Sequence, residues 1–225
     1  MLRIKFSGGR QFTDPKSPTS CSCKTLAVIL GRPDIKKMER HEYFKLFHNI
    51  GSADYNLLTD NLKTKTFKKG DFITVSGQIQ RELYFVKSGV QMSYFDTDNK
   101  THVIAFTYPP NLCAIPESFQ FQIPSKYFLS CLTDSELDYI TFDELQKLFD
   151  KSQKIERLFR RMTEAVLAGM INRHIELHSM TIEERYKTFC QRSPHLLQLV
   201  PHKYIASYLG IDRTNFSKLF NTVKL

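Results

Sequence analysis

The sequence lacks any long run of apolar residues. Its longest candidate run spans residues 26–30, whereas a helix that crosses a bilayer needs about 20 apolar residues. We therefore expect a protein that has no membrane-spanning segment and is soluble.

Cysteine is sparse, and its number is odd. The five cysteines are Cys21, Cys23, Cys113, Cys131 and Cys190. They are too few for a disulfide scaffold, and no convincing secretory signal accompanies them. We expect reduced thiols and a cytoplasmic protein.

Acidic residues are outnumbered, 23 against 32 lysines and arginines, which gives a formal net charge of +9. The excess lies at the two ends of the chain, because residues 1–40 and 180–225 are basic while residues 41–179 are close to neutral. A basic end beside a neutral middle favours a module that binds a polyanion. An ordinary solvated basic surface is the alternative.

The chain divides into four parts by composition and periodicity. Residues 1–38 mix glycine, proline, serine and basic residues without a sustained period, which predicts a loose extension and makes Met38 a possible working start. The expected parts after it are a β-barrel domain in 39–150 that opens with two short helices, a long helix in 151–179 and a DNA-binding domain in 180–225.

Short apolar or alternating runs, separated by glycine and Asp-Asn turns, predict small antiparallel strands in the barrel region. The expected strands are 63–67, 72–75, 82–87, 90–95, 102–107, 127–132 and 136–141. So many short strands indicate a jelly-roll barrel large enough to hold a small ligand, and an α+β fold overall.

The long helix carries a heptad-like seam. Its members, expected to form a homodimer interface, are Leu158, Met162, Ala165, Gly169 and Asn172. On this interpretation Phe159, Val166 and Met170 cover the barrel from the same helix. The alternative is a helix that packs on its own domain.

Helix signals follow at regular intervals in the last part. Thr181 and Glu184 form a capping box, which starts a new helix and a new domain. Pro201 can open a further helix, Gly210 ends it, and Asp212 can cap the next one. This spacing predicts a helix-turn-helix.

The outer face of its second helix is polar and carries no acid. We expect DNA contacts from Arg213, Thr214, Ser217, Lys218 and Asn221, and phosphate contacts from Lys203, Tyr204 and Ser207. A hairpin of two helices with a purely structural role is the alternative.

Four segments together resemble the family of the cyclic-AMP receptor and the fumarate-nitrate regulators, Crp/Fnr. These are FKKGDFITVSGQ, LYFVKSGVQMSYF, ESFQFQIPSKYFLSCLTDSEL and PHKYIASYLGID, and the resemblance covers about residues 39–225. It implies a cyclic-nucleotide-binding-like barrel, a dimerisation helix and a bacterial transcription regulator. It also implies that Arg213, Thr214 and Lys218 make the main base contacts.

The sensor region departs from the family pattern, which places Gly-Glu-Leu before an Arg-Ser-Ala or Arg-Thr-Ala. Here the matching stretches are NLCAIPESF and PSKYF, so a lysine stands where an arginine would pair with the cyclic phosphate. Candidate effector-pocket residues are Glu117, Ser118, Ser125, Lys126 and Tyr127. We do not expect cyclic AMP, and the effector, if there is one, stays unknown.

No cofactor or metal is expected. Cys21 and Cys23 supply two ligands where an iron-sulfur cluster needs four, and His102 alone makes neither a haem site nor a cupin-like metal centre. We therefore expect a protein that is not an enzyme.

The favoured function is a dimeric, sequence-specific transcription regulator that binds double-stranded DNA, with RNA polymerase as a further candidate partner. One alternative is a sensor or dimerisation protein without DNA binding, which the end of the chain at Leu225 motivates. The other is a cupin-like metal enzyme.

Overall fold

The computed structural model describes residues 38–98 and 100–223. Two four-stranded antiparallel sheets form a barrel-like sandwich, with strand orders β1-β8-β3-β6 and β2-β7-β4-β5. The strands are β1 (Lys63–Phe67), β2 (Phe72–Thr74), β3 (Glu82–Ser88), β4 (Gln91–Thr97), β5 (Lys100–Thr107), β6 (Leu112–Cys113), β7 (Phe128–Cys131) and β8 (Ser135–Thr141).

Strand β3 shows how the barrel is built, because apolar side chains leave it on both faces. Tyr84 and Val86 point between the two sheets, where they pack with Leu129 of β7 and Leu137 of β8. Leu83 and its neighbours on the other face pack against helices instead. Alternating side chains of one strand therefore serve two cores.

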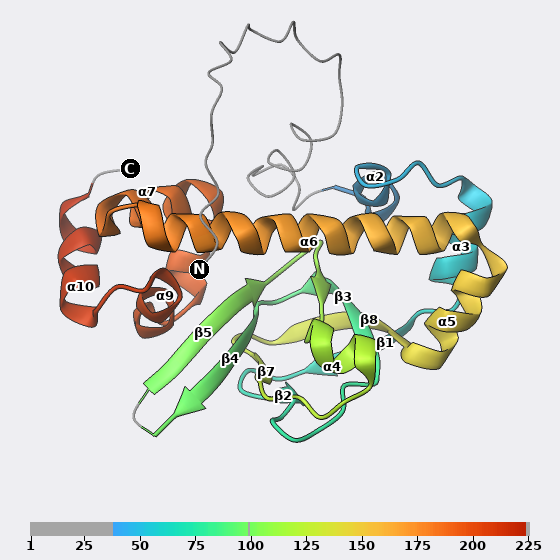
Figure 1. The fold of residues 1–225 in the computed structure, drawn as a ribbon, viewed down its shortest axis with the longest axis horizontal. Coiled ribbons are helices and arrows are strands. Elements are labelled where there is room, and N and C mark those ends of the chain that lie inside the picture. Colours follow the sequence, from blue (N-terminus) through green and yellow to red (C-terminus); the bar gives the residue numbers. More distant parts are fainter. Residues whose placement is uncertain (1–37, 99, 224–225) are drawn as a thin grey trace, which may run out of the picture.

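Helices cover the outer face of the first sheet. These are α2 (Arg40–Lys45), α3 (Ser52–Thr59), α5 (Phe142–Lys151) and the first half of α6 (Gln153–Ser179), and a short helix, α4 (Pro116–Phe121), joins β6 to β7. Helix α6 runs along the whole molecule above the barrel (Figure 1). At 27 residues it is about 40 Å long at 1.5 Å per residue.

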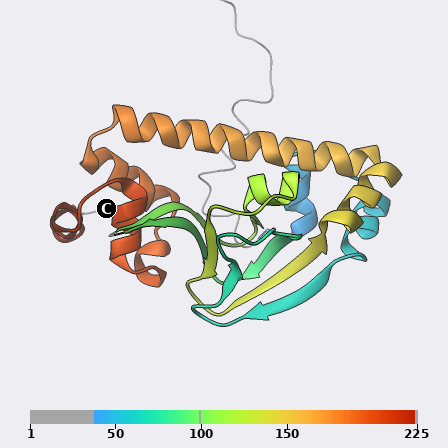
Figure 2. The same cartoon turned by 60° about the horizontal axis from the view of Figure 1, so that its bottom comes forward.

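The remaining helices gather at the far end of α6. They are α7 (Ile182–Arg192), α8 (Leu196–Leu199), α9 (His202–Leu209) and α10 (Arg213–Thr222). The turned view shows them beside the end of the β4–β5 ribbon (Figure 2). None of the described helices has the length and apolar character needed to cross a membrane.

The α+β class with a jelly-roll barrel, a long helix and a C-terminal helix-turn-helix is confirmed. Each of the seven expected strands is present within a few residues of its expected bounds. Strand β6 was not expected, because two residues are too short for a periodic signal. The expected loose extension lies outside the described residues, apart from Met38.

Candidate nucleic-acid interface

Helices α9 and α10 are joined by a tight turn that the sequence specifies. Helix α9 ends at Gly210, whose φ of 62° is left-handed, and the Ile211 N–H donates to the Ala206 carbonyl over 3.0 Å. A Cβ at Gly210 would lie 3.2 Å from a guanidinium nitrogen of Arg185, so a larger residue is crowded there as well as strained.

A buried cluster holds the two helices across this turn. Ile205, Leu209 and Ile211 pack with Phe216 of α10 and with Tyr186 of α7, and all five side chains are buried. The Tyr186 and Phe216 rings meet edge to face with centroids 5.6 Å apart. Phe216 is therefore the main inward-facing anchor of α10, at 2% exposure.

Asp212 caps the start of α10. Its carboxylate accepts from the Asn215 backbone N–H over 2.9 Å and also from the Asn215 side-chain amide. The backbone hydrogen bond from Asn215 is the main reason that the pKa of Asp212 lies below its ordinary value. Because the Asn215 amide is engaged within the cap, it is not free to read a base.

The outer face of α10 presents the residues that the sequence predicted for DNA contact. Arg213, Thr214, Ser217, Lys218 and Asn221 are all exposed. These side chains can donate or accept hydrogen bonds, and no acid lies among them, which is the chemistry that base edges in a major groove require.

The three residues of α9 that were predicted to contact phosphate have different surroundings. Lys203 is exposed, and its ammonium lies 4.7 Å from the ring centroid of the half-buried Tyr204. Ser207 is engaged elsewhere: its hydroxyl donates to the Thr101 carbonyl over 2.7 Å and accepts from the Val103 N–H over 3.1 Å. The Ser207 hydroxyl is therefore not available for a phosphate contact in this arrangement, contrary to the prediction.

These hydrogen bonds dock the helix-turn-helix on the edge strand of the second sheet. Thr101 and Val103 belong to β5, whose outer edge would otherwise present unpaired backbone groups. Nearby, the Phe106 and Tyr208 rings pack at 5.2 Å. The barrel thus holds α9, and with it the helix-turn-helix, against β5.

A second set of contacts joins the same domain to α6. Glu176 forms ion pairs with Arg173 at 3.7 Å and with Arg192 of α7 at 3.0 Å. The Arg173 guanidinium also lies 3.9 Å from the centroid of the Tyr208 ring in α9, and burial lowers its pKa. We did not predict this junction, although the Arg-x-x-Glu spacing on a helix could have indicated the first pair.

The expected dimer seam faces inward. Leu158, Met162 and Ala165 are buried at 0–3% exposure in the core that α6 shares with the barrel. Gly169 is partly buried on the same side, and Asn172 is exposed. The first three residues therefore cannot form a free surface, and the alternative in which this stripe packs on its own domain is the correct one for them.

A second apolar stripe lies on the outer side of α6. It consists of Val166, Leu167, Met170, Ile171 and Ile175, which are 46–58% exposed. The expectation that Val166 and Met170 cover the barrel is wrong, whereas Phe159 does so at 7% exposure. We name these five residues the outer stripe of α6. Periodicity marked two stripes on this helix, but it could not say which one faces the barrel.

The five candidate effector residues do not line the cavity between β2 and β3, and their side chains have other contacts. The buried Ser118 hydroxyl accepts from the Gln80 N–H and donates to the Ile123 carbonyl, and the Ser125 hydroxyl bonds the Tyr127 backbone. Glu117 and Lys126 face each other at 4.0 Å on the surface. The two hydroxyls are therefore already engaged in holding loops, and neither is free to bind a phosphate oxygen in this arrangement.

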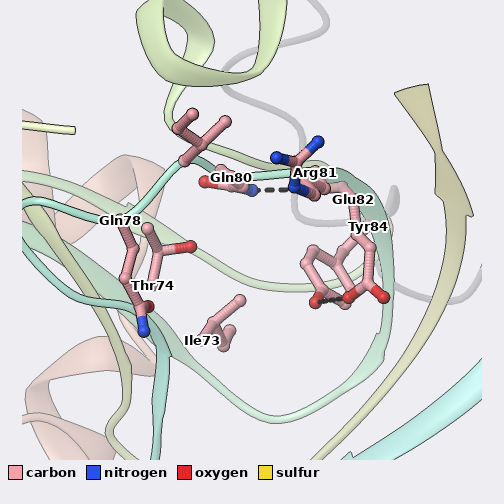
Figure 3. Close-up of a pocket in the computed structure, with 8 residues that line it drawn as sticks. Ile73, Thr74, Gln78, Gln80, Arg81, Glu82 and Tyr84 are labelled. Carbon is pink, nitrogen blue, oxygen red and sulfur yellow. Dashed lines mark hydrogen bonds between the residues drawn. The ribbon is translucent and has the colours of Figure 1, made fainter. Parts of the chain in front are cut away.

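A cavity of about 430 Å³ opens instead beside the loop between β2 and β3 (Figure 3). Its lining is Ile73, Thr74, Gln78, Ile79, Gln80, Arg81, Glu82 and Tyr84. The polar groups of Gln80 are already paired, because its amide donates to the Glu82 carbonyl and accepts from the Ile115 N–H. Tyr84, which lines the cavity, also packs with Cys113 and Tyr139 in the cluster between the two sheets.

Within residues 38–98 and 100–223, no three His, Cys, Asp or Glu side chains converge as metal ligands. His102 stacks on Phe95 with centroids 4.7 Å apart and hydrogen-bonds the Thr97 hydroxyl at 3.1 Å, as an ordinary strand histidine does. Cys21 and Cys23 lie outside the described residues.

Several solved structures share this arrangement. FixK2 from Bradyrhizobium japonicum superposes with a TM-score of 0.63 at 18% identity, over 71% of this chain and 83% of that one. A transcriptional regulator from Eubacterium rectale, described as of the Crp/Fnr family, gives 0.60 at 18% identity over 80% and 86%.

A CooA mutant from Carboxydothermus hydrogenoformans gives a TM-score of 0.55 at 14% identity, over 84% of this chain and 82% of that one. No family model and no curated protein matches the sequence. The similarity therefore lies in the three-dimensional arrangement, and the chain has the fold of the Crp/Fnr transcription regulators, with a cyclic-nucleotide-binding-like barrel, a long helix and a C-terminal helix-turn-helix.

Proposed function

We propose that the chain is a cytoplasmic, sequence-specific DNA-binding transcription regulator of the Crp/Fnr type that acts as a homodimer. The observation that carries the proposal is the exposed, acid-free face of α10, held by a capped and well-packed helix-turn-helix. Such a helix fits the major groove with its first residues at the base edges.

Arg213 and Lys218 are the residues best suited to read bases. Both are exposed, and either cation can pair with the O6 and N7 acceptors of guanine, a contact that discriminates by about 1–3 kcal/mol. Lys203 lies on α9 and suits a phosphate, which adds affinity without sequence preference.

Dimerisation follows from the outer stripe of α6. A homodimer with two-fold symmetry needs a patch that is complementary to itself, and the segment 166–172 is apolar or neutral throughout, so two copies meet without like-charge repulsion. Two parallel α6 helices would place two α10 helices to read half-sites about 34 Å apart.

In this proposal the barrel controls the orientation of the DNA-binding helices. Because β5 holds α9 through Ser207, the orientation of α10 is tied to the sheet rather than left to a flexible linker. An effector that moves the β4–β5 ribbon would shift the reading helices. The packed interior gives no support to a cyclic nucleotide as that effector.

The direct test is the selection of bound sequences from random DNA by the purified full-length chain. We expect a two-fold symmetric motif, and we expect Arg213→Ala and Lys218→Ala to lose it. Lys147→Ala, an exposed cation on α5, is the matched control and should keep it. Unchanged selection by the two α10 variants would contradict the assignment.

A salt titration separates DNA binding from a sensor role without DNA. The slope of log affinity against log salt scales with the number of phosphates neutralised, by about −0.9 for each. We expect a clearly negative slope that becomes shallower by about one unit in Lys203→Ala. A flat slope would favour a dimerisation or sensor protein.

A further inference from the structure

Two histidines lie on the exposed surface of α6 in its last two turns. His174 and His178 are exposed, four residues apart, and their ring centroids are 4.4 Å apart. Residues at this spacing share one side of a helix. The two imidazoles therefore lie together on one side of α6.

The pair continues the outer stripe rather than lying beside it. Leu167, Ile171, His174 and His178 follow one another in steps of four, three and four residues, the repeat of a two-helix seam. His174 lies seven residues after Leu167, about two turns, and so points the same way. A second copy whose α6 runs parallel to this one along Leu167 and Ile171 also covers the histidines.

No protein group described in the structure uses either imidazole. The recorded contact of each ring is with the other histidine, and the nearest acid in sequence, Glu176, is engaged by Arg173 and Arg192 on the opposite side of the helix. In an apolar seam such polar rings would be desolvated without partners, which is unfavourable.

We propose that His174 and His178 of two copies together bind one divalent transition-metal ion, zinc being the best match. The inference rests on the proposed dimer. Four imidazoles satisfy the tetrahedral coordination of zinc, and the absence of a free carboxylate beside the described pair disfavours magnesium and calcium.

The two-copy requirement follows from the ligand count. One chain offers two imidazoles, and the described residues of one chain bring no third ligand to them. The partner copy completes the set, so the metal binds the dimer and not the single chain. By linkage, zinc then strengthens the dimer.

The position of the site gives it a regulatory consequence. Helix α6 ends at Ser179, and α7 begins at Ile182, so the ion ties the two long helices together directly before the DNA-reading domains. The Glu176 junction lies within the same turn and carries the constraint to α7 and α9. Zinc thereby fixes the separation of the two α10 helices and raises affinity for the two-fold motif.

The test uses the full-length chain with zinc chloride as the probe and magnesium chloride as the negative control. Equilibrium dialysis with metal analysis gives the stoichiometry, and sedimentation equilibrium in EDTA and in zinc gives the dimer dissociation constant. We expect one zinc per two chains and a fall of about ten-fold or more in that constant.

The variants isolate the site. His174→Gln/His178→Gln should lose both effects, with an unchanged circular dichroism spectrum because both positions are exposed. His48→Gln, a histidine whose pKa is lowered by burial and by neighbouring arginines, is the matched control and should keep them. Cys21→Ser/Cys23→Ser removes two thiols, a ligand type that zinc also accepts, and should keep both effects.

Each other outcome overturns the proposal. A dimer in EDTA that binds no zinc refutes the metal site and leaves the proposed regulator intact. One zinc per chain that needs the histidine pair refutes the two-copy site, and zinc retained by the double variant lies elsewhere. A monomer in both EDTA and zinc refutes the proposed dimer together with this site.

Discussion

Two leucines on opposite sides of α6 give the sharpest test of how this helix is used. Leu158 and Leu167 are nine residues apart, or two and a half turns, so they point in opposite directions. Leu158 is 0% exposed in the core with the barrel, and Leu167 is 58% exposed on the outer stripe. The same change to alanine should therefore have different effects at the two positions.

The magnitudes follow from burial. Alanine at Leu158 removes three carbon groups that contribute about 0.8 kcal/mol each, and the cavity left behind brings the expected loss of unfolding free energy to about 3–5 kcal/mol. At Leu167 less than half of the side chain is buried within the chain, so the loss should be about 1 kcal/mol or less. The dimer should instead weaken in Leu167→Ala.

The assay is urea unfolding at several protein concentrations, together with sedimentation equilibrium. Leu158→Ala should lower the unfolding midpoint equally at every concentration, because it acts within one chain. Leu167→Ala should lower the midpoint mainly where the wild type is dimeric. If Leu158→Ala dissociated the dimer while it left the stability of the chain unchanged, the inward orientation of that side chain would be refuted.

Two further predictions concern the contact between the helix-turn-helix and β5, and the start of α5. Ser207→Ala removes a hydroxyl that makes two hydrogen bonds to β5, so we expect a loss of about 1–2 kcal/mol in urea unfolding, together with faster amide exchange in α9 and α10. Glu144 has a pKa lowered to about 2, chiefly by the hydrogen bond from Lys63 and also by the Thr141 capping box, so its contribution is present above the ordinary value of 4.5 and lost as the pH falls toward 2. The stability difference between the wild type and Glu144→Gln should therefore shrink from pH 6 to pH 2.5 in urea unfolding.

Each of these predictions has a control variant. Ser76→Ala changes an exposed loop serine whose hydroxyl donates one long hydrogen bond, 3.5 Å, to the Ser125 carbonyl, and it should stay within about 0.5 kcal/mol of the wild type. An equal loss there would remove the special role of Ser207. Asp143→Asn lies in the same first turn as Glu144 but outside the capping box. A pH-independent difference for Glu144→Gln would show that the carboxylate charge is not what stabilises the helix start.

Much of the site could be predicted because its signals are local. The capping box at Thr181, the N-cap at Asp212 and the left-handed Gly210 depend on a few neighbouring residues. Periodicity places Phe216 inward and Arg213 outward on the same short helix. Such patterns are set by backbone geometry and by the separation of apolar from polar side chains, which act within one or two turns.

Other features depend on contacts between segments far apart in the sequence. Ser207 looks like a phosphate ligand by its position on α9, but the edge of β5, more than 100 residues away, takes its hydroxyl. The Ser118 and Ser125 hydroxyls likewise hold loops rather than line a pocket. No local pattern contains the partner, so the role cannot be assigned from the segment alone.

The sequence by itself determined the types of the elements, the order of barrel, long helix and helix-turn-helix, and the polar face of α10. Each of these depends on the preferences of neighbouring residues and on hydrophobic periods of two or 3.6 residues. Tertiary structure alone decided which stripe of α6 is core and which is free. Both stripes are apolar, and the choice is made by the shape of the sheet surface that meets Leu158 and leaves Leu167, Ile171 and the histidine pair exposed.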